Sequence, residues 1–177
     1  FKAAETFELQ NELYPVSTNY NSIGVLYSNA GATDKAIEFY EKALEENPHD
    51  KHAYANLGST LLYKKPKQAK EYLQKALNID PEHDIALIEL GKIDKSEGNT
   101  VAAQVKFRKA YDLYLKQWKT NSLPKYAYGW FATVAEELEE NNFAKEIRAS
   151  APKTESEAYY NKENLSMTKT KALTNNN

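Results

Sequence analysis

Glycine, alanine, aromatic or leucine, and proline residues recur along this chain with a period of 33 to 34 residues. Steps of 12, 4, 3 and 5 residues separate the recurring positions in the first unit, and the later units keep these steps to within one residue. The recurring residues, unit by unit, are Gly24, Ala36, Tyr40, Ala43 and Pro48; Gly58, Ala69, Leu73, Ala76 and Pro81; and Gly91, Ala103, Phe107, Ala110 and Leu115. This self-similarity is typical of stacked helical hairpins, so the sequence predicts an all-α solenoid.

Each recurring residue type has a physical role in a helical hairpin. Ala36 and Tyr40 are four residues apart, which places them on one buried face of a helix. Gly24 and Ala36 are small, so two antiparallel helices can approach closely where they cross. Pro48 and Pro81 lack a backbone donor and clash with the preceding turn, so they predict helix ends. The Asn and Asp residues beside them suit helix caps in the turns between hairpins.

The segments NSIGVLY, AIEFYEKALEENP, AYANLG and AKEYLQKALNIDP, between Tyr20 and Pro81, resemble tetratricopeptide repeats. The resemblance implies a right-handed superhelix of helix pairs. It also implies that the first helix of each pair lines a concave groove, which holds a peptide or helix of a partner protein. The predicted function is therefore a non-enzymatic protein–protein interaction scaffold.

The same spacing divides the chain into repeats and ends. Leu115 stands where two earlier units have proline, which predicts a long second helix in the third repeat, and Ala132, Ala144 and Arg148 mark a degenerate fourth repeat. The expected divisions are the second helix of a truncated repeat at 1–16, repeats at 17–50, 51–83 and 84–119, the degenerate repeat at 125–152, a capping helix at 153–167 and a polar tail at 168–177.

The N-terminal segment supports two alternatives to a free scaffold. Its first helix is missing and the chain starts with Phe1, which predicts a fragment or processed form. The stretch ETFELQNELYPVSTNYNSIG is similar to repeats at the C-terminal ends of bacterial esterases and serine hydrolases, which implies an accessory domain of a larger bacterial enzyme. The other alternative is homo-oligomerisation through an uncovered face carrying Ala3, Phe7 and Tyr14.

Composition and charge argue against several other partner classes. The formal charge is -2 and the pI is about 6.0, so there is no electrostatic footprint for nucleic acid. We interpret the cluster of Lys64, Lys65, Lys67 and Lys70 as a solvated turn. No segment is apolar enough to span a bilayer, and the chain has no cysteine for disulfides or thiol chemistry. The expectation is a soluble protein of the cytoplasm or periplasm, with no nucleic-acid or membrane partner.

No motif predicts catalysis, a metal or a cofactor. The chain lacks a Gly-rich phosphate loop and a Gly-x-Ser-x-Gly elbow. His49 and His52 lie across a predicted turn rather than on one helix, so we interpret them as solvated rather than as zinc or nickel ligands. The acidic run from Glu136 to Glu140 is interpreted as the wet face and end of a helix.

The resemblance assigns groove positions to particular residues. The predicted peptide-binding residues are Asn21, Val25, Asn56, Ser59, Leu62, Tyr63, Ile85, Ile88, Lys92 and Lys95. Our hypothesis is that four of them, Leu62, Tyr63, Ile85 and Ile88, form an exposed apolar strip, with the two lysines setting the direction of the bound segment. The alternative is that these side chains pack against neighbouring first helices and touch no partner.

Two finer expectations concern charged residues. One member class of the resembling family grips the C-terminal carboxylates of heat-shock chaperones. At the matching places this chain has Asn21, Val25, Asn56, Ile85 and Glu89, of which only Asn56 fits, so we predict no such clamp. Asp94 stands at a partly buried position and needs a partner, either Lys106, Lys109 or water.

Overall fold

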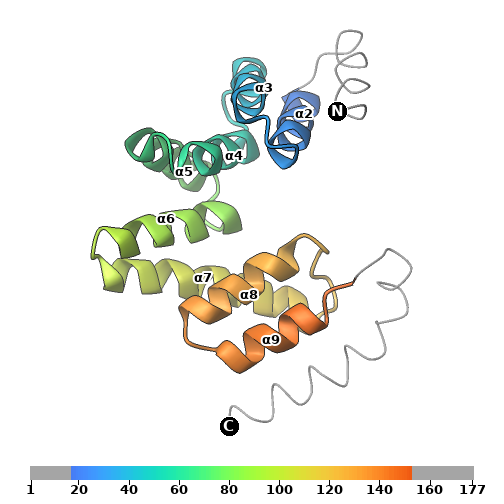
Figure 1. Cartoon of the computed structure of the whole chain (residues 1–177), viewed down its shortest axis with the longest axis vertical. Helices are drawn as coiled ribbons and strands as arrows, with labels where there is room; N and C mark the ends of the chain where they lie inside the picture. The colour runs from blue at the N-terminus through green and yellow to red at the C-terminus, as the bar shows by residue number, and fades with distance from the viewer. Residues whose placement is uncertain (1–16, 153–177) are drawn as a thin grey trace. The chain divides into compact units, whose positions relative to one another are not determined.

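The computed structural model describes residues 17–152, and every regular element in that range is an α-helix. The helices are α2 (Ser17–Asn29), α3 (Thr33–Glu46), α4 (Lys51–Leu61), α5 (Pro66–Ile79), α6 (Asp84–Ser96), α7 (Thr100–Lys119), α8 (Ala127–Glu137) and α9 (Asn141–Ala149), drawn in Figure 1. The all-helical prediction is confirmed over this range. The expected segments at 1–16, 153–167 and 168–177 lie outside the described residues, and so does the face carrying Ala3, Phe7 and Tyr14.

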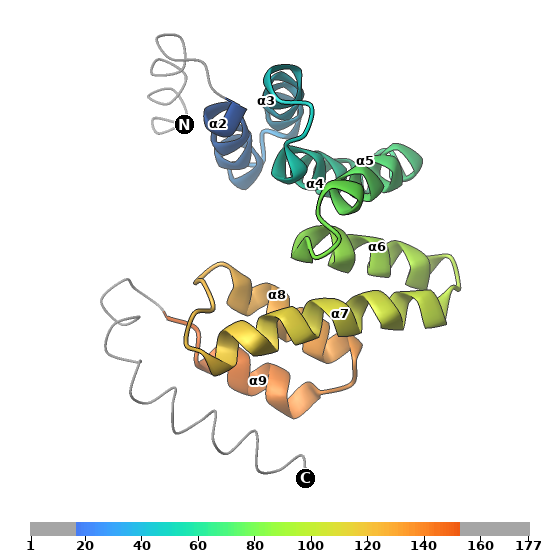
Figure 2. The same cartoon turned by 180° about the vertical axis from the view of Figure 1, so that it is seen from behind.

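The chain divides into two compact units, with the boundary between Ile93 and Asp94 inside α6. In the first unit α2 packs against α3, α4 packs against α5, and α3 joins the two pairs by packing against α4 (Figure 2). Two buried clusters hold this unit together. One joins the first pair to α4 and α5 through Ile23, Tyr27, Ala36, Phe39, Tyr40, Leu57, Leu61 and Ala69; the other joins the second pair to α6 through Ala55, Leu73, Ala76, Ala86, Leu90 and Ile93.

The repeated glycines mark close approaches between paired helices. A Cβ atom added to Gly24 would lie 2.5 Å from Cε1 of Tyr40. One added to Gly58 would lie 2.7 Å from Cγ of Leu73 and 3.1 Å from the backbone oxygen of Ala69. These distances are shorter than ordinary carbon contacts, so a larger residue would force the helices of each pair apart.

Polar side chains stabilise the turn between the two pairs and the turn that follows the second pair. The Asp50 carboxylate accepts hydrogen bonds from the backbone N–H groups of His52 (2.9 Å) and Ala53 (3.0 Å), which caps α4. The Asn47 side chain accepts from the N–H of His49 at 3.0 Å, and the Asp80 side chain accepts from the N–H of Glu82 at 2.9 Å. These bonds satisfy backbone donors at the start of α4 and in the two turns, and they fix polar residues that line the pocket described below.

In the second unit an aromatic cluster lies between α7, α8 and α9. Helix α7 is 20 residues long, and its last turns place Trp118 against Tyr128, Phe131 and Phe143, with ring centroids 5.7, 5.9 and 6.1 Å away. Proline at Leu115 would interrupt this helix before Trp118. The extra length of α7 therefore supplies a large part of the core of this unit.

The partner of Asp94 is one of those expected. Nζ of Lys106 lies 2.5 Å from Oδ2 of Asp94, and the Asp94 residue is only 7% exposed. A carboxylate at such a place is tolerated because a cation from the next helix compensates its charge.

Candidate peptide-binding site

The first helices of the two pairs are joined by a side-chain hydrogen bond. Nδ2 of Asn56 on α4 donates to Oδ1 of Asn21 on α2 at 3.0 Å, and both side chains are half-buried. The bond fixes the orientation of both amides. It also leaves Asn21 at the edge of an open pocket in the first unit.

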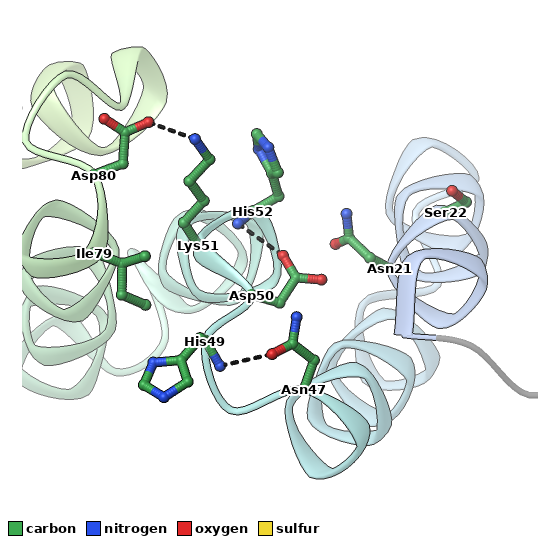
Figure 3. Close-up of a pocket in the computed structure, with 9 residues that line it drawn as sticks. All are labelled: Asn21, Ser22, Asn47, His49, Asp50, Lys51, His52, Ile79 and Asp80. Atoms are coloured by element: carbon green, nitrogen blue, oxygen red, sulfur yellow. Dashed lines mark hydrogen bonds and ion pairs between the residues drawn. The ribbon is translucent and has the colours of Figure 1, made fainter.

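This pocket has a volume of about 670 Å³ and is lined mostly by polar and charged residues. Its residues come from α2, the turn before α4, the first turn of α4 and the end of α5: Asn21, Ser22, Asn47, His49, Asp50, Lys51, His52, Ile79 and Asp80. Figure 3 shows Asn21, Asn47 and Asp50 turned toward the same space. Segments up to about sixty residues apart in sequence therefore line one pocket.

The charged residues of the pocket are held in fixed positions. Nζ of Lys51 lies 2.6 Å from Oδ2 of Asp80, and this contact holds the pKa of the Asp80 carboxyl below its usual value. The Asp50 residue is 8% exposed and its carboxylate is occupied with capping α4. Neither carboxylate needs to rearrange before a ligand enters, so the pocket is preorganised.

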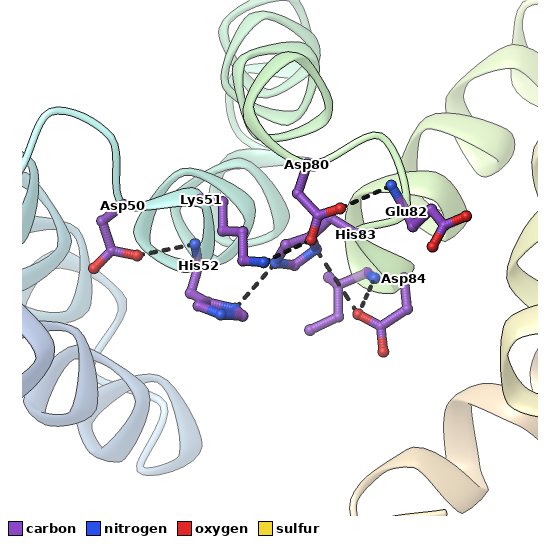
Figure 4. Close-up of polar contacts among 8 residues, drawn as sticks. Asp50, Lys51, His52, Asp80, Glu82, His83 and Asp84 are labelled. Carbon is purple, nitrogen blue, oxygen red and sulfur yellow. Dashed lines mark hydrogen bonds and ion pairs between the residues drawn. The ribbon is translucent and has the colours of Figure 1, made fainter. Parts of the chain in front are cut away.

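A pair of histidines adjoins the pocket (Figure 4). Nδ1 of His52 lies 3.1 Å from Nε2 of His83, and the ring centroids are 5.0 Å apart. His52 is exposed and lines the pocket, whereas His83 is buried in the turn between α5 and α6. Burial, and next the neighbouring His52, lowers the pKa of the His83 imidazole. Its other nitrogen, Nδ1, lies 3.8 Å from Oδ1 of Asp84 and finds no hydrogen-bond partner among residues 17–152.

The predicted apolar strip is not formed as an exposed surface. Ile88 is 0% exposed, so the expectation that it faces a partner is wrong. Leu62 and Ile85 are half-buried and pack on the clusters of the first unit. Tyr63 is 92% exposed, but it follows the last residue of α4 and lies in the turn before α5. Burying an aliphatic side chain is favourable by about 1.5–3 kcal/mol, which explains why the aliphatic members of the strip turn inward.

The remaining predicted residues lie in varied surroundings. Val25 is half-buried against the first cluster, and Oγ of Ser59 is buried without a hydrogen bond to any part of the chain that the structure describes. Nζ of Lys92 lies 3.2 Å from Oε1 of Glu89, and Nζ of Lys95 lies 2.6 Å from Oε2 of Glu137 within the second unit. Among the ten predicted residues, Asn21 is the one that lines the pocket.

Sequence reasoning placed most of the pocket residues in turns and did not assign them to a site. His52 stands at one of the groove positions that the resemblance implies, and the missed lining residues are Ser22, Asn47, His49, Asp50, Lys51, Ile79 and Asp80. A usable signal was present, because the two inter-hairpin turns NPHD and NIDPEHD both carry the capping Asn or Asp side chains that line the pocket, Asn47, Asp50 and Asp80. Contacts between these turns depend on how the pairs stack, which the spacing alone does not specify.

Two further searches covered residues 17–152. No group of three or more His, Cys, Asp or Glu side chains in that range is arranged to hold a metal ion. None of the helices there has both the length and the apolar composition needed to cross a membrane.

Comparison with known proteins identifies the family. Two models of the tetratricopeptide repeat match, one over residues 20–50 and the other over residues 52–83. Residues 20–83 therefore carry two tetratricopeptide repeats, and the fold is an α-solenoid of helix hairpins. No curated protein matches the chain at a significant level.

Solved structures share this fold at low sequence identity. The crystal structure of MamA is 20% identical with a TM-score of 0.55, and the match covers 92% of this chain and 88% of that chain. A second MamA structure is also 20% identical, with a TM-score of 0.54 and coverage of 91% and 81%. The second TPR of Spaghetti (RPAP3), bound to the HSP90 peptide SRMEEVD, is 17% identical with a TM-score of 0.51 and coverage of 62% and 96%.

The family defines the general role of the chain. Tetratricopeptide repeats generally bind protein or peptide partners and are generally non-catalytic. The protein is therefore a protein–protein interaction scaffold.

Proposed function

We propose that the polar pocket of the first unit binds an extended segment of a partner protein, and that the protein has no enzymatic activity. The observation that supports this most strongly is the pocket itself, about 670 Å³ of preorganised polar space beside the Asn21–Asn56 bond. Its size falls within the range of about 300–1,000 Å³ that is usual for ligand sites. The net charge of -2 is in keeping with a protein partner rather than nucleic acid.

The lining suits the backbone of an extended peptide. Such a peptide carries N–H and C=O groups that need partners when they leave water. The amides of Asn21 and Asn47 offer both donors and acceptors, and Figure 3 shows them facing the same space. Ile79, which is 38% exposed, offers an apolar contact for one side chain of the partner. We therefore assign the peptide's polar contacts to the asparagines and its apolar contact to the end of α5.

The test substitutes exposed pocket residues whose side chains do not cap a helix or a turn. A peptide is first selected from a random library displayed on phage, with the whole chain as bait, and its dissociation constant is measured by calorimetry. The double variant His49→Ala, Ile79→Ala removes two exposed walls and should weaken binding about tenfold or more, because truncating a central contact commonly costs over 1 kcal/mol.

The matched control is a double variant with substitutions on the exposed faces of α3 and α5, the second helices of the two pairs. Glu45→Ala on α3 and Glu71→Ala on α5 truncate exposed side chains outside the pocket and should leave the affinity unchanged. Equal affinities of the pocket variant and the control would contradict the assignment of this pocket.

The peptide SRMEEVD provides a second test, because we expect no chaperone-tail clamp. Val25 and Ile85 stand where the clamp needs polar or cationic groups, and Glu89 stands where it needs a cation. Glu89 is buried beside Lys92, so its negative charge disfavours a nearby carboxylate. Calorimetry at low salt should show no heat of binding. Tight binding that is lost when the peptide's C-terminal carboxylate is amidated would show that the prediction is wrong.

A further inference from the structure

We propose that the contact between His52 and His83 makes the pocket sensitive to pH: as the pH falls below neutrality, both imidazoles become protonated, the contact breaks and peptide binding weakens. This inference rests on the function proposed above, because the regulated site is the same pocket. It concerns two histidines that are not among the recurring residues of the repeats.

The geometry ties the pocket wall to the next turn of the chain. His52 belongs to the first turn of α4 and lines the pocket, and its Nδ1 lies 3.1 Å from Nε2 of His83. His83 precedes α6, and its backbone N–H donates to the oxygen of Asp80 at 3.0 Å. The imidazole pair is therefore a direct side-chain link between α4 and the turn that connects α5 with α6 (Figure 4).

The surroundings select one tautomer of the neutral pair. In folded proteins, buried N–H groups without an acceptor are rarer than buried acceptor atoms without a donor. Nδ1 of His83 is buried and has no hydrogen bond among residues 17–152, so we place its proton on Nε2. That Nε2–H then donates to Nδ1 of His52, which keeps its own proton on Nε2.

Charged groups face His83 from each neighbouring element. Lys51 and His52 approach from α4, Asp80 from the end of α5, and Asp84 from the first turn of α6. The two carboxylates favour a charged imidazole, but Asp80 is already paired with Lys51 at 2.6 Å. Burial is the largest influence and opposes charge, and His52 and Lys51 act in the same direction, so the pKa of His83 is lowered.

Full protonation would destroy the contact. Two imidazolium rings in this arrangement would point N–H groups at each other across 3.1 Å. Relief requires the exposed His52 ring to rotate or the first turn of α4 to shift. Both movements alter the pocket wall, because Asp50, Lys51 and His52 line it together. Loss of the bond therefore changes the shape and the charge of the site at the same time.

The first experiment needs no ligand. The imidazole Cε1–H signals of the three histidines are followed by NMR from about pH 8 to about pH 4.5, the range in which imidazoles titrate. We expect His83 to titrate below 6.5, its ordinary value, and to titrate at higher pH in the variant His52→Gln. The backbone amides of Asp50 and Lys51 should shift with the same midpoint as His83. An unchanged His83 midpoint in His52→Gln would overturn the proposal.

The second experiment measures binding. The affinity of the selected peptide should fall about three- to tenfold between about pH 7.5 and about pH 5.5, because peptide binding then competes with protonation of the pair. His52→Gln, whose side chain is exposed, should flatten this dependence without risk to folding. His49→Gln should keep it, because His49 lines the pocket but is not in the pair.

The outcomes separate the two proposals. Failure to select any pocket-dependent peptide would overturn the proposed function and this inference with it. A peptide whose affinity responds to pH equally in wild type and His52→Gln would agree with the proposed function. It would contradict the proposal that the His52–His83 contact regulates the pocket.

Discussion

Glycine at position 58 lets α4 and α5 lie close together. Because Gly58 has no Cβ atom, the Leu73 side chain and the Ala69 carbonyl occupy the space where that atom would stand. The Leu73 side chain can rotate, but the carbonyl belongs to the backbone of α5 and moves only if the helix moves. Gly129 on α8 is a natural comparison, because a Cβ atom there would meet nothing within 4 Å.

The first prediction compares these two glycines. Gly58→Ala should lower the free energy of unfolding by about 1–3 kcal/mol, because overpacking outweighs the better helix propensity of alanine. Gly129→Ala should raise it by up to about 1 kcal/mol, because the propensity gain meets no contact. Urea unfolding followed by circular dichroism measures both. A stabilised Gly58→Ala would show that the two helices separate at little cost.

The second prediction concerns the effect of pH on stability through His83. Its pKa is lowered in the folded protein, so the unfolded chain binds a proton more readily. The stability linked to this residue should be fully present above 6.5 and should be lost as the pH falls below that value toward the lower folded-state pKa. His83→Gln removes the titration, so its free energy of unfolding should fall less than that of wild type between about pH 7.5 and about pH 5. Parallel losses in both proteins would contradict this. The lowered pKa of Asp80 acts at more acidic pH and should not interfere.

At the scale of whole elements, helix ends explain both a success and an error of the sequence analysis. The absence of proline at Leu115 correctly indicated that helix formation continues, and α7 runs to Lys119. The apolar strip is not formed because Ile88 is buried and because α4 ends at Leu61, which leaves Tyr63 in the following turn rather than on a helix face. A residue beyond a helix end no longer follows the helical period, so its direction cannot be extrapolated from the preceding turns.

The third prediction tests the length of α7. Leu115→Pro should destabilise the second unit by about 3 kcal/mol or more, because proline removes a helical hydrogen bond and clashes with the preceding turn. The near-ultraviolet circular dichroism signal should fall, since Trp118 and its aromatic neighbours would lose their packing. Asp112→Ala, at an exposed site on the same helix, should leave that signal intact. An unchanged aromatic signal in Leu115→Pro would show that the cluster forms without the last turns of α7.

At the scale of the whole molecule, the chain is a repeat scaffold, and the residues of its proposed site come from more than one repeat. The pocket takes Asn21 from the first helix of one pair and Asp80 from the end of the next pair. Repeat surfaces are reused for many ligands, so the family sets the architecture and the pocket's own residues set what it recognises. This is why the proposed function depends on His49, Ile79 and the asparagines rather than on the repeat signature.

The sequence by itself determined the repeat period, the all-helical fold and the ends of the second helices before Pro48 and Pro81. These features depend on local chemistry: proline stops a helix, asparagine and aspartate cap one, and small residues at steps of 3 and 4 make one packed face. Only the tertiary structure decided that Ile88 is buried, that Lys106 is the partner of Asp94 and that His52 meets His83. Each of these depends on how one helix lies against another, which is set by the packing of many side chains at once.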